Sequence, residues 1–489
     1  MHRMLEPLHG PCSSRVRDHY SSLMRSLVLA VFAILAALPC AAQDAAPRTA
    51  EPHTAEPPHA PAAPASPVAG DGPQSPTFNP AASAEGAWPW QSSTLSGDWG
   101  GLRTKLSDSG VVLTGVATVD LATVMGQTPE RGFVMPYLVD VSLSIDTHKA
   151  GWWEGGQVYL DFQQGGAIGK PMTMVPDYWG WDAVYPFTQD YTELSQYWYQ
   201  HSFIDGALRL KLGKIDANVD FAVSYPNLQF INSAAYMPSV VALDLPTFPY
   251  QAGGFEILGR PLEWLDAKFG MFDGSTNWYD PSTGTAGPST GSHGVGGFFW
   301  DNPGAYFLIG ELNARWDQVP LPGHLNLGWF QQTGDSAEPG NSRVPSPLGQ
   351  QEVTGAWGLY SSFSQRLWQP EGASSGQGIA AFGQFGWSPP SRNPSQWSIM
   401  GGGTWQGLLP SRESDTAGLM VAYAHFSNTP ALTPSPGQGE FVVETFYNIQ
   451  VTPWLGIQPD LQYIHQPSSV PEADIGGAWI LTFRVSVNF

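Results

Sequence analysis

Residues 479–489, at the C-terminus, alternate between apolar and polar side chains. One parity is large and apolar throughout: Trp479, Leu481, Phe483, Val485, Val487 and Phe489. The other parity is mostly polar and includes Thr482, Arg484, Ser486 and Asn488. Because successive side chains of a strand point to opposite faces, this segment predicts a strand with one apolar and one polar face. Its length fits the ~9–11 residues that a tilted strand needs to cross a bilayer. It therefore indicates either the last strand of an outer-membrane barrel or a half-buried strand of a soluble sandwich.

The same period-2 pattern recurs along most of the chain. It is clear over residues 111–119, 137–145, 208–212, 441–451 and 455–463. Strands of soluble proteins are usually nearer 5–6 residues long, and closing a sheet gives every backbone polar group in a membrane a partner. The polar parity carries Gln, Asp, Glu, Arg and Lys, so we expect a wet interior. The pattern thus favours an all-β, transmembrane antiparallel β-barrel that forms a channel.

Composition supports a barrel and excludes several other functions. Only 13% of the 489 residues are charged, against ~25% in ordinary soluble domains. Aromatic residues make up 12%, and the formal net charge is −21. This acidic balance argues against a nucleic-acid partner, because binding phosphates requires clustered Lys and Arg. No motif indicates a catalytic residue, a metal ligand or a cofactor, so we predict a protein that is not an enzyme.

The N-terminal part predicts export. Residues 1–42 are expected to be a signal peptide, with Arg25 before an apolar run at 27–38 and the start expected at Met24. Cys12 and Cys40, the only cysteines, lie in this segment. Residues 43–87 are Pro- and Ala-rich and predict a disordered periplasmic segment. Residues 88–489 are then the barrel. The predicted location is the bacterial outer membrane, with membrane lipid as a partner.

Several motifs resemble the carbohydrate-selective porin family of OprB-like outer-membrane porins. They lie at 95–106, 194–200, 210–218, 407–412 and 458–464. The resemblance implies a barrel of 16 strands that admits sugars by diffusion, and a C-terminal strand ending at Phe489 that the barrel-assembly machinery recognises. A homo-oligomer is possible. One departure is Gln196, where the family usually has Glu in its Leu-Ser-x-Tyr-Trp motif, so this position carries one negative charge fewer than the family pattern.

A sugar site needs aromatic faces for C–H patches and polar groups for hydroxyls. We expect Trp198 to be a stacking platform and Arg209, Lys211 and Asp216 to be hydroxyl partners. Other residues predicted to line the pore are Gln196, Lys214, Asn218, Asp460 and Gln462. As alternatives, Lys214 and Asp216 pair with each other to hold the wall, and Trp198 belongs to an interfacial girdle. In the N-terminal motif, Asp98, Trp99 and Arg103 are expected to anchor a segment against the barrel.

Three functions remain open from the sequence. The leading interpretation is an outer-membrane porin for the passive, carbohydrate-selective diffusion of mono- or small oligosaccharides, glucose-like in size, into the periplasm. The second is a general diffusion porin whose acidic surplus favours cations. The third is a β-rich outer-membrane or secreted enzyme that uses paired carboxylates.

Overall fold

The computed structural model describes the chain from residue 92 onward, with gaps. The undescribed positions are 1–91, 129, 171–173, 185–189, 224, 243, 275–277, 281–284, 288–305, 318–320, 334, 337–352, 373–375, 430–436 and 468–475. The predicted signal peptide (1–42) and the Pro/Ala-rich segment (43–87) lie outside the described residues. All described residues belong to one compact unit, Ser66–Phe489. None of the helices in this described part is long and apolar enough to cross a membrane.

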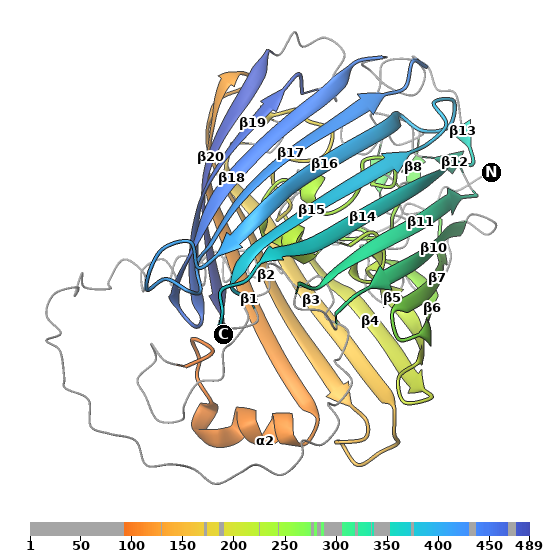
Figure 1. The fold of residues 1–489 in the computed structure, drawn as a ribbon, viewed down its shortest axis with the longest axis vertical. Helices are drawn as coiled ribbons and strands as arrows, with labels where there is room; N and C mark the ends of the chain where they lie inside the picture. The colour runs from red at the N-terminus through yellow and green to blue at the C-terminus, as the bar shows by residue number, and fades with distance from the viewer. Residues whose placement is uncertain are drawn as a thin grey trace, which may run out of the picture. The chain divides into compact units, whose positions relative to one another are not determined.

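Sixteen antiparallel strands form a closed barrel, in which each strand pairs with the next and β20 closes on β1 (Figure 1). In order, they are β1 (Val111–Gln127), β2 (Gly132–Asp146), β3 (Gly156–Gly169), β4 (Tyr191–Phe203), β5 (Leu208–Ile215), β6 (Ala252–Leu262), β7 (Leu265–Asp273), β10 (Tyr306–Arg315), β11 (Gly323–Gln332), β14 (Trp357–Trp368), β15 (Gly378–Trp387), β16 (Ser395–Gln406), β17 (Thr416–Phe426), β18 (Gly439–Thr452), β19 (Leu455–His465) and β20 (Gly477–Asn488). The predicted all-β barrel of 16 strands is confirmed.

Two further pairs of short strands lie outside the barrel wall. They are β8 (Trp278–Asp280) with β9 (Thr285–Gly287), and β12 (Asp335–Ser336) with β13 (Val353–Thr354). β8 and β9 lie in the connection from β7 to β10, and β12 and β13 lie in the connection from β11 to β14. Both connections are at the same end of the barrel.

The alternation along each strand separates an outer from an inner surface. In β20, Trp479, Leu481 and Phe483 are exposed on the outside, whereas Thr482 and Arg484 are buried inside. Other exposed outer residues include Leu210, Leu212, Leu327, Leu359, Ile399 and Leu419. The C-terminal ring of Phe489 fills the space over Gly115, where a Cβ atom would lie 2.5 Å from its Cε2. The predicted two-faced terminal strand is therefore a barrel strand that pairs with β1 and β19.

A short N-terminal segment is attached to the end of the barrel that carries the C-terminus. It contains η2 (Trp99–Gly101) and α2 (Leu102–Asp108). The Asp98 carboxylate accepts from the Thr104 backbone N–H at 2.8 Å, and Arg103 lies 4.3 Å from the centre of the Trp99 ring. The Leu95 N–H donates to the Asn488 carbonyl at 2.8 Å, which joins the segment to β20. Arg103 also donates to the Leu113 carbonyl of β1 at 3.3 Å, whereas the contacts of Asp98 and Trp99 named above lie within the segment. The functional role of the three residues stays a prediction.

The two ends of the barrel differ in their connections. At the end that carries the C-terminus, the turns are short, such as residues 204–207, 263–264 and 453–454. At the other end, long connections follow β3 and β5. Outer-membrane barrels have short periplasmic turns and longer extracellular loops. We call the first the short-turn end and the second the long-loop end.

Two of these connections fold back into the barrel (Figure 1). The short inner loop is residues 174–184, after β3. The long inner loop is residues 216–251, after β5, described except for positions 224 and 243 and containing η4 (Ala217–Val219), η5 (Tyr225–Gln229) and η6 (Ser233–Ala235). Their apolar side chains pack on apolar residues of the inner wall, such as Phe230 on Phe382 and Phe446. The interior is therefore partly packed, and the expectation of an interior that is wet rather than packed is wrong where these loops fold in.

Candidate functional site

The inner loops are fixed to one side of the barrel by hydrogen bonds from their backbone. On β18, the Glu444 carboxylate accepts from the N–H groups of Ile231 at 2.5 Å and Asn232 at 3.0 Å. On β19, Gln462 accepts from the Asn232 amide at 3.0 Å and donates to the Trp181 carbonyl at 3.0 Å. Gln462 thus holds both loops at once. Because Glu444 and Gln462 are buried and fully engaged, they act as anchors of the loops.

The loops also pair with each other. The Ala183 N–H donates to the Ile231 carbonyl at 3.0 Å, and the Ser233 N–H donates to the Gly180 carbonyl at 2.9 Å. These two bonds satisfy backbone groups that would otherwise be buried without partners. The short and long inner loops therefore form one joined body where they meet β18 and β19.

A buried ion cluster holds the short inner loop near the closure of the barrel. Arg484 on β20 makes two bonds to Asp120 on β1, at 2.9 and 2.7 Å, and lies 3.7 Å from the Asp182 carboxylate of the loop. All three side chains are buried. Burial, together with the negative charge of Asp120, raises the pKa of Asp182 well above its usual value, although Arg484 opposes this shift. Removing Arg484 would leave two buried carboxylates without a cation.

Further anchors continue along the same side of the barrel. The Ala222 N–H donates to Glu311 on β10 at 2.8 Å, and the Asn326 amide on β11 donates to the Val223 carbonyl at 2.9 Å. The Ser239 N–H donates to Ser398 on β16 at 3.0 Å. We call the inner surface of β10 to β20 the covered wall, because the loops bond to strands along its length.

The root of the long inner loop is held by charges on β5 and β6. The Lys211 ammonium, only 4% exposed, contacts the Asp220 carboxylate and lies 2.9 Å from Glu256. Burial favours the neutral form of Asp220, but Lys211 outweighs it and lowers the pKa of Asp220 below its usual value. Lys211 therefore has two carboxylate partners, and its donors are occupied by the protein.

Two other carboxyl groups of this loop have pKa values shifted in the opposite direction, upward. Burial raises the pKa of Asp216 to about 6 and that of Asp244 to about 7. Asp216 accepts from the Asn218 N–H at 3.0 Å and the Phe248 N–H at 3.1 Å, so it organises the first turn of the loop. The docked loop consequently holds protons more tightly than a solvated loop would.

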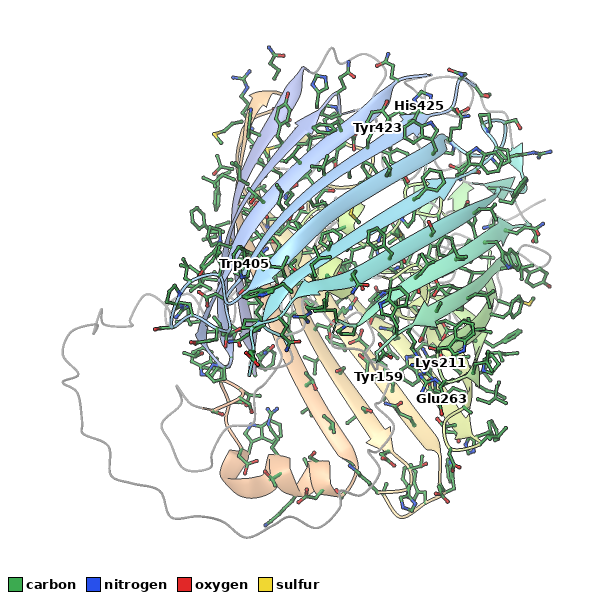
Figure 2. All side chains as sticks on the ribbon, viewed as in Figure 1. Tyr159, Lys211, Glu263, Trp405, Tyr423 and His425 are labelled. Atoms are coloured by element: carbon green, nitrogen blue, oxygen red, sulfur yellow. The ribbon has the colours of Figure 1, made fainter. Side chains whose placement is uncertain are left out.

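The inner surface of β2 to β5, which we call the open wall, has a different character. Trp198 stacks on Tyr159 with ring centres 4.8 Å apart, and the Lys211 ammonium lies 5.0 Å from the Trp198 ring centre. Tyr159 and Lys211 belong to β3 and β5 (Figure 2), which flank β4 on either side. The Gln163 amide donates to Asp140 at 2.8 Å. This wall combines an aromatic pair with polar groups, several of them only half-buried.

Most residues predicted to line the pore hold protein structure. Lys214 pairs with Glu193 at 3.6 Å, rather than with Asp216 as the alternative expected. Gln196 accepts from the Asp216 N–H at 3.2 Å, the Asn218 amide donates to the Phe221 carbonyl at 3.0 Å, and Asp460 accepts from Gln462 at 3.3 Å. Trp198 packs with the apolar cluster inside the barrel and is not a girdle residue. Contact of these residues with sugar stays a prediction.

Arg209 differs from the other predicted residues. It is half-buried on the inner parity of β5, near the short-turn end. Among the described residues it has no hydrogen bond or ion pair, although its charge contributes with that of Lys211 to the lowered pKa of the Asp220 carboxyl. Of the predicted hydroxyl partners, Arg209 is the cation best placed to donate to a solute.

The sequence did not reveal as a set the loop anchors Glu311, Arg484 and Glu440, whose carboxylate accepts from the Tyr178 backbone N–H at 2.8 Å. A signal was present, because apolar residues such as Phe382, Met400 and Met420 occupy the inner parity of β15 to β17. An apolar residue at a position expected to face water implies that something covers it. In this chain, what covers these positions is the inner loops.

Comparisons with known proteins agree with this architecture. The family model described as carbohydrate-selective porin, OprB family, matches residues 137–489. Porin B of Pseudomonas aeruginosa is 22% identical over 443 residues, which cover 81% of this chain and 91% of that protein. A high-pH structure of Pseudomonas putida OprB has a TM-score of 0.67 at 20% identity, covering 83% of this chain and 100% of the other. A low-pH structure of the same protein has a TM-score of 0.51 at 17% identity, covering 81% and 99%.

Proposed function

We propose that this chain, a member of the carbohydrate-selective porin, OprB family, conducts monosaccharides or small oligosaccharides of glucose-like size by passive diffusion into the periplasm. Members of this family are outer-membrane channels and not enzymes. One observation carries this proposal. The loops bond mainly to the covered wall, and on the open wall the half-buried pair Tyr159 and Trp198 lies beside hydrogen-bonding groups, with Trp198 also packed against the long inner loop.

The chemistry of the open wall suits a neutral, hydroxylated solute. Aromatic faces accept the C–H patches of a sugar ring, while carboxylate, amide and guanidinium groups exchange hydrogen bonds with its hydroxyls. Asp140, Gln163 and Arg209 supply these three groups from β2, β3 and β5. Contacts of this kind are weak enough individually for the solute to leave again, as conduction requires.

A general cation-preferring pore is the second candidate, favoured by the net charge of −21. In the lumen, however, several carboxylates are neutralised by Lys211, Lys268 and Arg484. These three cations thus compensate part of the acidic surplus inside the barrel.

The test is single-channel conductance of the full-length barrel in a planar bilayer, titrated with glucose and with maltose. A sugar-selective pore should show saturable block of the ion current. Trp198→Ala should weaken this block about tenfold, because an aromatic stacking contact worth ~1.4 kcal/mol is lost. Open channels that no sugar blocks would instead support the general pore.

Two matched variants make the result specific. Trp198→Phe retains an aromatic face and should keep part of the block. Trp405→Ala removes a tryptophan from the outer surface of β16 (Figure 2) and should leave the block unchanged. Equal loss of block in Trp405→Ala and Trp198→Ala would remove Trp198 from the solute path.

A further inference from the structure

The outer surface of the barrel has a groove that runs along β5. Its volume is about 570 Å³. Together with the inner-parity positions Lys211 and Glu256, it is lined by outward side chains of three neighbouring strands: Tyr199, His201 and Phe203 on β4, Leu210 and Leu212 on β5, and Phe255 and Ile257 on β6. The strand register aligns Tyr199, Leu212 and Phe255 in one row across the groove. The leucines of β5 thus lie between two ridges of larger side chains, and the groove is almost wholly apolar.

A chain of hydrogen bonds gives this apolar groove one directed polar group. The Trp153 indole N–H donates to the Tyr199 hydroxyl oxygen at 2.8 Å. Tyr199 and His201 Nδ1 are 2.7 Å apart. Indole can only donate, so its proton goes to the oxygen of Tyr199. The Tyr199 O–H can then donate to His201 Nδ1, and in that tautomer a neutral His201 carries its proton on Nε2.

The Nε2–H of His201 has no partner among the described residues. It belongs to a side chain that lines the groove, on the surface that faces the bilayer. A hydrogen-bond donor in an apolar surrounding is costly unless an acceptor reaches it. The groove therefore fits a molecule with an acceptor oxygen next to a long apolar chain.

The position of the groove along the barrel indicates which molecule this is. The adjoining turns of the short-turn end expose Trp152, Trp153, Ile204 and Trp264. Exposed tryptophans mark the level of the lipid headgroups, and the short turns are the periplasmic side of such barrels. The groove is continuous with the lipid-facing surface and lies at the boundary between headgroups and acyl chains of the periplasmic leaflet, which is made of phospholipid.

We propose that this groove, the β5 groove, is a binding site for one phospholipid of the periplasmic leaflet. An acyl chain lies along Leu210 and Leu212 between the two ridges. An ester or phosphate oxygen of the same lipid accepts the Nε2–H of His201, whose orientation Tyr199 and Trp153 fix. The site is on the opposite side of the barrel wall from the lumen, so it is independent of the solute path.

Native mass spectrometry of the detergent-extracted full-length barrel, titrated with phosphatidylethanolamine, tests the proposal. The wild type should retain one lipid under conditions that strip the others. Leu212→Trp fills the groove and should abolish the retained lipid. His201→Phe keeps the ring but removes the donor, and should weaken retention about threefold to tenfold, as expected for one hydrogen bond.

The control is Leu419→Trp, an equally exposed outer leucine on β17, far from the groove in the strand order. It should retain the lipid as the wild type does, and all three variants should show wild-type heat-modifiable gel mobility and sugar block. Retention that survives Leu212→Trp, or is lost equally in Leu419→Trp, would overturn the site. A dimer or trimer that Leu212→Trp dissociates would also overturn it, because the groove would then hold a second copy of the chain.

Discussion

The strands of the covered wall and of the open wall alternate in the same way between inner and outer side chains, but their inner side chains bond to different partners. On the covered wall, inner-facing carboxylates and amides accept or donate to backbone groups of the loops, as Glu444 and Gln462 do. On the open wall, polar side chains bond mainly to one another, as Gln163 does with Asp140. The difference shows that a charged residue at a lumen position can be structural or solute-facing, and that only its partner distinguishes the two.

The largest expected difference between the walls is in stability. Arg484→Met leaves Asp120 and Asp182 buried without their cation and should cost about 3–5 kcal/mol. Arg209→Met, on the open wall, should cost less than about 1 kcal/mol, since Arg209 has no ion pair to lose. The temperature at which the folded band disappears on a gel measures both. Equal melting of the two variants would contradict the division into walls.

The next effect concerns the loops themselves. Glu444→Ala removes the acceptor for two backbone N–H groups, and charge-assisted bonds of this kind contribute about 1.5–3 kcal/mol each. We expect the long inner loop to loosen, so that single-channel current becomes larger and noisier. Glu444→Gln keeps one acceptor oxygen and should lie between the wild type and Glu444→Ala. An unchanged current in Glu444→Ala would mean that Glu444 does not hold the loop at the channel.

A smaller effect should appear with pH. Asp216 and Asp244 have pKa values raised to about 6 and about 7 in the docked loop, above the ~3.9 of a free aspartate. Their contribution to docking is therefore complete below about pH 4 and is lost as the pH rises to about 7. Proteolysis of the loop should accelerate over this range.

Asp244→Asn isolates one of the two groups. The amide does not titrate, so the rate of proteolysis of this variant should depend less on pH. The protease should still cleave its loop. A cleavage rate that falls as the pH rises would contradict the sign of both shifts.

The smallest effect is expected on the open wall. Arg209→Ala removes one potential donor to a sugar hydroxyl, and a net hydrogen bond contributes about 1 kcal/mol, or about fivefold in affinity. The concentration of glucose that half-blocks the current should rise by this factor, with folding unchanged. Arg209→Lys retains the charge and should recover part of the block, whereas no change in either variant would place the solute path away from β5.

The sequence by itself determined the barrel, because a strand in a bilayer must alternate to face lipid on one side. The terminal strand, the outer leucines and the inner polar positions all followed from that single constraint. The tertiary structure decided which inner residues are engaged by the inner loops and which are not. Lys211, Asp216 and Gln462 have the residue types of a sugar site, but their polar contacts are made with the inner loops. Where a loop returns to the wall depends on contacts between residues far apart in the chain, such as Asn232 with Gln462, and no local pattern encodes such a contact.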